Sequence, residues 1–306
     1  MNKNMSLKNK LNYEEVFNAM VKHLKNYIKE NNRKSVVLGI SGGIDSTIVS
    51  CICYQVSKEL NNEGYDFTFY GRSLPSSTTN IEELSISIDV GQAFCDNFKV
   101  YDCDILDDVS TMIFRETNKS LVPIHQNDEY VDKLRKGNIK SRLRMIELYD
   151  LARAKQGMVI GTDNYTEYLL GFSTIGGDAL FDYCPIQYLW KTEVYEMAEY
   201  IKEYYKDDAV KVDAINKSIM IAPQDGLGIS NNDVEQIGGK DYNEIDDILY
   251  NICYSGKIPN EDDYTSGAVT KIYERYKNSE FKRNHPYRLS RDYYSDIIDN
   301  GFDDCK

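Results

Sequence analysis

Histidine is scarce in this chain, which has only three among its 306 residues: His23, His125 and His285. A catalytic triad built around histidine, or a metal site made of several histidines, is therefore not expected. The seven cysteines form no CxxC pair and follow no metal-ligand or disulfide spacing, so we expect reduced thiols with mostly structural roles. The chemistry should instead use carboxylates, amides and bound ions.

Long apolar runs and blocks of basic residues are also missing. About 18 consecutive apolar residues occur nowhere, and the first segment, MNKNMSLKNKLNYEEVF, lacks the apolar core of a signal peptide. We therefore expect a cytoplasmic protein with no membrane partner. Acidic residues outnumber basic ones by 49 to 36, a formal net charge of -13, so nucleic acid is not expected as a partner. Phosphates can still bind where backbone amides and a few cations are placed together.

Short apolar segments alternate with helical patterns along the first two thirds of the chain. The expected strands cover 35–40, 66–75, 99–103 and 157–162, and the expected helices cover 13–31, 46–60, 79–98 and 128–155. Strands separated by helices form parallel sheets. The pattern predicts an α/β fold with a Rossmann-like parallel sheet flanked by helices.

The length of the chain suits one domain with appended helices. We expect a single domain over 1–306, with an N-terminal helix at 13–31, a nucleotide-binding core at 35–205, and a C-terminal loop and helices at 211–306. The stretch 163–190 is rich in Gly, Asp, Thr and aromatic residues and has weak periodicity, which is typical of a functional loop or lid.

The segment SVVLGISGGIDSTIV, residues 35–49, joins a buried strand to a helix through a loop with two glycines. Ligands of open parallel sheets bind at such strand ends. Gly42 and Gly43 would leave backbone N–H groups open to an anion, and the next helix adds its positive dipole end. Asp45 would repel a phosphate unless a metal joined the two, which favours Mg²⁺. The simpler alternative is a tight glycine turn with Ser46 as the helix cap.

A second strand end carries Thr162 and Glu167, in the stretch VIGTDNYTEYLLGF at 159–172. In a parallel sheet it lies near the first loop. Glu167 can then join Asp45 on one Mg²⁺, while Thr162 reaches the nucleotide. The alternative for Glu167 is a solvated helix residue.

The string SGGIDS resembles the pyrophosphate loop of the ATP pyrophosphatases, which split ATP into AMP and pyrophosphate. Three later stretches, NIKSRLRM at 138–145, VIGTDNYTEYLLGF at 159–172 and EFKRNHP at 280–286, are similar in order and spacing to those of NAD synthetases. The resemblance covers most of 35–290 and implies an adenine nucleotide alpha-hydrolase-like fold. GTDxxxE and NxxxRxRM are not shared with the GMP synthetase or tRNA-modifying branches.

This resemblance implies roles for individual residues. Mg²⁺ would be held by Asp45 and Glu167, and Asp178 would act catalytically beside the ammonia site, where a carboxylate attracts ammonium and takes its proton. ATP would contact Ser41, Gly42, Gly43, Ile44, Asp45, Ser46, Thr162 and Lys191, and deamido-NAD would contact Arg142, Asp182 and Lys282. The alternatives are a surface lysine for Lys191, a solvated helix charge for Arg142, and Asx-turn formers for the two loop aspartates.

The resemblance implies ATP-dependent amidation of deamido-NAD with ammonia, through an adenylated carboxylate, in a homodimer that completes the dinucleotide site. The 34 residues before the first expected strand are too few for a glutaminase domain. The chain departs from the family pattern in four places: Ile175 replaces a lysine, Gln224 a threonine and Phe281 a histidine, and the usual GDGG string reads Gly177-Asp178-Ala179-Leu180. Two alternatives stay open, namely a tRNA-modifying ATP pyrophosphatase and a nucleotide-binding regulatory module without catalysis.

Overall fold

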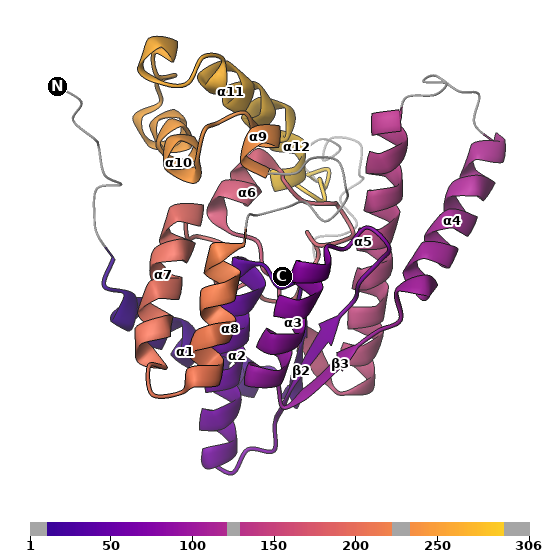
Figure 1. Ribbon diagram of the computed structural model, residues 1–306, viewed down its shortest axis with the longest axis vertical. Helices are drawn as coiled ribbons and strands as arrows, with labels where there is room; N and C mark the ends of the chain where they lie inside the picture. The colour runs from indigo at the N-terminus through magenta and orange to yellow at the C-terminus, as the bar shows by residue number, and fades with distance from the viewer. Residues whose placement is uncertain (1–10, 121–128, 222–232, 291–306) are drawn as a thin grey trace, which may run out of the picture.

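The protein is described by a computed structural model over residues 11–120, 129–221 and 233–290 (Figure 1). Within these residues one sheet of four parallel strands has the order β3-β2-β1-β4. In the register, Val36 lies between Phe69 and Met158. The strands are β1 (Ser35–Gly39), β2 (Thr68–Ser73), β3 (Asn97–Val100) and β4 (Gly157–Val159). The predicted α/β fold with a parallel sheet is confirmed.

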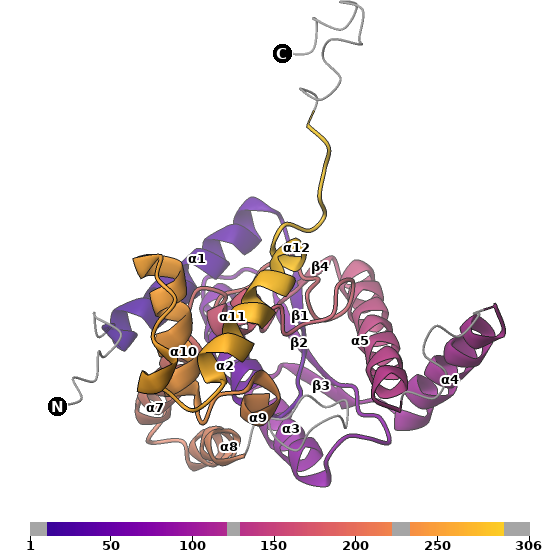
Figure 2. The same ribbon diagram turned by 90° about the horizontal axis from the view of Figure 1, so that it is seen from above.

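Helices cover both faces of this sheet (Figure 2). One face is covered by α1 (Tyr13–Glu30), α2 (Ile44–Asn62), α3 (Ile81–Phe94), α7 (Lys191–Tyr204) and α8 (Ala209–Met220). The other face carries α5 (Glu129–Ala154), with α4 (Cys103–Ser120) packed on it. Among the described helices, none combines the length and the hydropathy that a bilayer-spanning segment needs.

The apolar pattern of β1 explains why it sits at the centre. Val36 and Leu38 point into the larger core with α1 and α2, whereas Val37 points to the other face, where α5 covers it. All three are fully buried. A strand buried on both faces reads as a continuous apolar run, as this one does. The polar residues that follow it are therefore carried to the open end of the sheet.

A separate layer of short helices stands at the end of the sheet where β4 leads into α6 (Tyr165–Leu170), towards the top of Figure 1. It also contains α9 (Asp233–Ile237), α10 (Tyr242–Tyr250), a π-helical turn (Asn251–Ser255), a 3-10 turn (Glu261–Asp263), α11 (Ala268–Asn278) and α12 (Glu280–Arg283). These helices share their own apolar cluster, which includes Leu170, Ile245 and Ile272. We call this group the C-terminal layer.

Three elements differ from the sequence expectation. The third strand lies at Asn97–Val100 and not at 99–103, because α4 already begins at Cys103. Helix α4 itself was not expected. Its buried positions, Leu106, Ser110 and Phe114, recur every four residues and form one face of the helix. Helix α8 was also not expected as a separate element.

Candidate active site

A cavity of about 520 Å³ opens beside the carboxyl ends of β1 and β4. Strand order reverses there, because β2 pairs with one side of β1 and β4 with the other. Ligands of open parallel sheets bind at this kind of switch point, and the volume lies within the usual range for ligand sites. The walls come from loop 41–46, segment 160–162, α5, the first turn of α7 and the C-terminal layer.

Loop 41–46 places its two glycines in different environments. Gly42 has a φ of 92°, and a Cβ there would lie 2.3 Å from the Glu83 carbonyl oxygen of α3. It does not line the cavity, whereas the other five residues of the loop do. Gly43 has an ordinary φ of -72°, and a Cβ there would make only a normal 3.4 Å contact with Ser41. Gly42 is therefore required by the fold, and Gly43 faces the cavity.

The first turn of α2 is open towards the cavity. Gly43 is its N-cap, so the alternative that Ser46 caps the helix is wrong. The Ser46 hydroxyl instead donates to the Gly43 carbonyl at 3.0 Å and lies 3.1 Å from the Ser41 hydroxyl. The first N–H groups of a helix have no partner within the helix and carry its positive dipole end. Two hydroxyls and these N–H groups together suit an anion.

Lys191, at the start of α7, joins two carboxylates inside the cavity. Its Nζ lies 2.5 Å from Asp45 Oδ2 and 2.8 Å from Glu167 Oε1. The lysine side chain is only 3% exposed, and each carboxylate side chain is 16% exposed. Burial disfavours the ammonium form, but Asp45 and Glu167 outweigh this and raise the pKa of Lys191. Burial also disfavours the charged form of Glu167 and so raises its pKa, and Lys191 offsets part of this rise.

The fold brings these three residues together from distant segments. Asp45 lies in the first turn of α2, after β1, and Glu167 in the first turn of α6, after the neighbouring strand β4. Asn164 fixes both, because its Nδ2 donates to Asp45 Oδ1 at 2.9 Å and its Oδ1 caps the Glu167 N–H at 3.0 Å. Two carboxylate oxygens within hydrogen-bond distance of one nitrogen form a place for positive charge. Such an oxygen pair fits Mg²⁺.

Asp178 lies in the loop 171–178 and lines the cavity. Its Oδ1 accepts a 2.6 Å hydrogen bond from the Ser141 hydroxyl of α5 and a 2.9 Å bond from the Thr174 N–H. From the opposite side, Lys282 of α12 donates to the Gly171 and Ser173 carbonyls at 2.7 and 2.6 Å. Burial lowers the pKa of Lys282, while Asp178 acts in the opposite direction. Two helices thus hold this loop.

Other predicted site residues lie elsewhere. Thr162 lines the cavity, but Arg142 and Asp182 do not. The Arg142 side chain is exposed, and its Nε donates to the Ile175 carbonyl at 3.1 Å. Asp182 accepts from the Val159 N–H at 2.8 Å and from the Tyr149 hydroxyl at 3.3 Å, so it braces β4. Substrate contacts by Arg142 and Asp182 stay predictions.

Of the three single-residue departures from the family pattern, two fall on described residues. Ile175 supplies the carbonyl that Arg142 binds, and the Phe281 side chain is 62% exposed. Gln224 lies outside the described residues.

Two charged residues were not predicted from the sequence: Arg144, which lines the cavity, and Asp163, which is buried beside it. The Nε of Arg144 donates to the Leu74 carbonyl at 2.8 Å, and burial lowers the pKa of Arg144. It follows Ser141 by three positions on α5, so both side chains lie on one helix face. Arg142 lies on a different face. Asp163 is only 7% exposed, and burial, then Asp178, raises its pKa. Its position in the GTD string, directly after Thr162, could have identified it as a candidate from the sequence.

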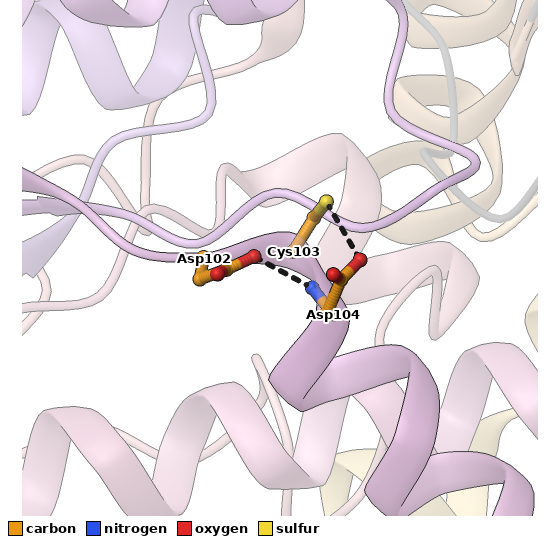
Figure 3. A group of neighbouring side chains, drawn as sticks. All are labelled: Asp102, Cys103 and Asp104. Carbon is orange, nitrogen blue, oxygen red and sulfur yellow. Dashed lines mark hydrogen bonds between the residues drawn. The ribbon is translucent and has the colours of Figure 1, made fainter.

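Another group of possible metal ligands lies outside the cavity, at the start of α4 (Figure 3). Asp102 accepts from the Asp104 N–H at 3.1 Å, and the Cys103 thiol points to the Asp104 carboxylate at 3.6 Å. Burial and Asp104 raise the pKa of Cys103, which favours the neutral thiol. The contacts are those of an exposed helix N-terminus, and we assign no metal to them.

Comparison with known proteins identifies relatives of this chain. A family model described as NAD synthase matches residues 16–286. An NH(3)-dependent NAD(+) synthetase from Thermoplasma volcanium is 33% identical over 261 residues, which cover 85% of this chain and 91% of the relative. A solved NAD+ synthetase from Burkholderia pseudomallei is 25% identical, with a TM-score of 0.63 over 90% of this chain and 92% of that one.

The same fold occurs in an NMN synthetase from Francisella tularensis, which has a TM-score of 0.70 at 23% identity and covers 92% of this chain and 98% of its own. That likeness concerns the fold alone. The family match, in contrast, runs from α1 to the end of α12 and includes the loop 41–46, Glu167 and Lys191. This chain therefore belongs to the NAD synthase family.

Proposed function

We propose that this protein catalyses the ATP-dependent amidation of deamido-NAD with ammonia, which yields NAD, AMP and pyrophosphate. The observation that supports it most directly is the cluster of Asp45, Lys191 and Glu167 beside an open helix N-terminus, at the switch point of a parallel sheet. This arrangement offers charges and N–H groups for a polyphosphate and a cation together. Family membership directs that chemistry to NAD synthesis.

In the first step, the substrate carboxylate attacks the α-phosphorus of ATP and pyrophosphate leaves. The step is needed because a carboxylate has no good leaving group, whereas the acyl adenylate can release AMP. The Ser41 and Ser46 hydroxyls and the first N–H groups of α2 would bind the departing pyrophosphate. Lys191 is close enough to add its positive charge there. Glu167 and Asp45 would hold Mg²⁺, which supplies further stabilisation of the phosphate charge when bound.

In the second step, ammonia attacks the acyl carbon of the adenylate and AMP leaves. Asp178 is the candidate to attract ammonium and to accept a proton from it, since it lines the cavity and its Oδ1 is fixed by Ser141 and Thr174. Lys282 lines the same part of the cavity and could meet the dinucleotide there.

The test is NAD formation by the purified protein from deamido-NAD, ATP, Mg²⁺ and ammonium. We expect one AMP and one pyrophosphate for each NAD, a rate that rises with pH as the NH₃ fraction grows, and no activity with glutamine. Binding of both substrates without release of AMP would favour the regulatory alternative. Nicotinic acid mononucleotide in place of deamido-NAD tests whether the site needs the whole dinucleotide.

Asp45→Asn is the matched variant for this assay. The amide keeps the size and the Asn164 contact but removes a charge from the pair that Lys191 bridges. We expect turnover to fall by on the order of 100-fold or more, with an unchanged melting curve, since losing a cation site costs several kcal/mol of transition-state stabilisation. Near-normal turnover at limiting Mg²⁺ would contradict the proposed role. Asp66→Asn, at an exposed position just before β2 and at the opposite end of the sheet from the cavity, is the control.

A further inference from the structure

A buried carboxylate lies next to the active site without lining its cavity. Asp246 of α10 is fully buried and is surrounded by the apolar cluster of the C-terminal layer, with Ile245, Ile248 and Leu249 beside it in the chain. Carboxylates are rarely fully buried unless they are paired, because removing the charge from water is costly. Apolar packing alone therefore does not explain why a carboxylate lies at this position.

Both oxygens of Asp246 hold segments that carry active-site residues. Its Oδ1 accepts a 2.5 Å hydrogen bond from the Thr166 hydroxyl, and its Oδ2 accepts a 2.9 Å bond from the Thr192 N–H. The Thr166 hydroxyl oxygen in turn accepts from the Lys191 N–H at 2.9 Å. Thr166 precedes Glu167 in the chain, and Thr192 follows Lys191. One carboxylate thus connects the first turn of α6 to the first turn of α7.

We propose that Asp246 is a positioning residue, which fixes the starts of α6 and α7 so that Glu167 and Lys191 both reach Asp45. Its link to NAD formation rests on the proposed function, whereas its effect on the cluster does not. The contacts from Lys191 to the two carboxylates are 2.5 and 2.8 Å long, and hydrogen bonds weaken steeply with small displacements. A relative shift of about 1 Å between the helix starts would break them.

The chemistry of the contacts explains why a carboxylate is used. It accepts from a hydroxyl and from a backbone N–H at once, and its negative charge lies at the positive dipole end of α7. The neighbouring Asp247 provides a natural contrast. It is only partly buried and accepts from the Tyr264 hydroxyl at 2.6 Å, a contact made entirely within the C-terminal layer. If Asp246 only stabilised the fold, replacing either aspartate should affect the active site to a similar extent.

The experiment compares Asp246→Asn with Asp247→Asn, and Thr166→Val with Thr166→Ser. Each variant is measured for NAD formation as a function of Mg²⁺, for thermal unfolding, and for Mn²⁺ binding in the presence of a non-hydrolysable ATP analogue, followed by electron paramagnetic resonance. We expect Asp246→Asn and Thr166→Val to need roughly 10- to 100-fold more metal, the usual effect of losing a residue that orients metal ligands. Thr166→Ser and Asp247→Asn should stay within about twofold of the wild type.

The outcomes separate this inference from the proposed function. Wild-type metal binding in Asp246→Asn, or an equal loss in Asp247→Asn, would overturn the positioning role. If Asp246→Asn does not fold, the Thr166 pair decides, because Thr166→Ser keeps the hydroxyl and Thr166→Val removes it. If the wild-type protein makes no NAD, the proposed function fails, while the Mn²⁺ measurement still tests how Asp246 acts on the cluster.

Discussion

At the scale of single residues, Lys191 organises the charges of the site. Its ammonium lies between two carboxylates that would otherwise repel each other, and it offsets part of the repulsion between Asp45 and Glu167. A buried ion pair of this kind costs much desolvation energy and is weak evidence for stability. Its presence in a cavity is better explained by a binding task. In the proposed function, ATP phosphates would contact Lys191 and a metal ion would bind the two carboxylates.

The two glycines of loop 41–46 give a prediction at this scale. Gly42→Ala should destabilise the protein by roughly 1–3 kcal/mol, because it combines a left-handed φ with a backbone clash against Glu83 of α3. Gly43→Ala should change stability by less than about 1 kcal/mol, since its φ is ordinary and space is present. Chemical denaturation measures both. Equal losses would mean that Gly42 is not packed against α3.

Asp246 gives a prediction on pH. Burial raises its pKa to about 6 although Thr166 and Thr192 hydrogen-bond to it, and Glu193 adds to the rise. Because the pKa is higher in the folded than in the unfolded protein, the folded state binds the extra proton between about pH 4 and 6. The free energy of unfolding should therefore fall as pH rises through this window, by about 3 kcal/mol at most, and stay level above it.

Subtracting the same curve for Asp246→Asn isolates this contribution from those of the other titrating groups. The free energy of unfolding of the wild type, minus that of the variant, should fall between pH 4 and pH 6.5. A constant difference across that range would show that Asp246 does not carry the raised pKa.

At the scale of elements, the loop 171–178 is held between α5 and α12. Ser141 binds Asp178 from one side, and Lys282 binds two loop carbonyls from the other. The active site is thus closed by helices more than 100 residues apart in the chain. The C-terminal layer therefore forms part of the wall of the cavity, through residues such as Arg275 and Lys282.

Substitutions of Asp178 in this loop and of Ser141, which binds it from α5, should separate the two steps of the reaction. Asp178→Asn should weaken the use of ammonium more than it weakens adenylation, measured as pyrophosphate release without ammonium. Ser141→Ala should have the same effect on a smaller scale, roughly tenfold in ammonium half-saturation, because a hydrogen bond to a carboxylate contributes about 1.5–3 kcal/mol. An equal loss of both steps in Asp178→Asn would instead indicate that the residue only positions the substrate.

At the scale of the whole molecule, α4 and α5 pack together on one side of the sheet (Figures 1 and 2). Several large apolar side chains of these two helices are exposed. They are Ile105, Met112, Ile113, Tyr130 and Ile146. Ile146 of α5 is 55% exposed. Many tyrosines of the C-terminal layer, in contrast, pack into its own apolar cluster. The exposed surface of α4 and α5 is the better candidate for a subunit interface.

We predict a homodimer formed through α4 and α5. Met112→Glu should weaken it strongly, because a two-fold interface contains each substitution twice. Met220→Glu is the control, since Met220 is 77% exposed on α8, on the other face of the sheet. Light scattering at micromolar concentration measures the mass of each variant. A wild-type monomer with full specific activity would show that one chain suffices for the site.

The sequence by itself determined the alternation of strands and helices, the α/β class and the position of loop 41–46 at a strand end. These features depend on residues close together in the chain, so periodicity and glycine placement reveal them. The resemblance of four short stretches led to the family that the comparisons confirm. Helix α8 was missed because its buried stripe, formed by Ala214, Ile215 and Ser218, is narrow. Helix α4 was also missed, although its buried residues recur every four positions.

Tertiary structure alone decided which side chains meet. Lys191 and Asp45 are 146 positions apart, and Thr166 and Asp246 are 80 apart, so no local pattern reports their contacts. The same holds for the choice of Arg144 over Arg142 as a cavity residue. It also holds for Asp182, whose carboxylate turns to the β4 backbone. A motif fixes which chemical groups are available, whereas the packing of distant helices fixes their directions, and only the directions distinguish a cavity residue from a brace.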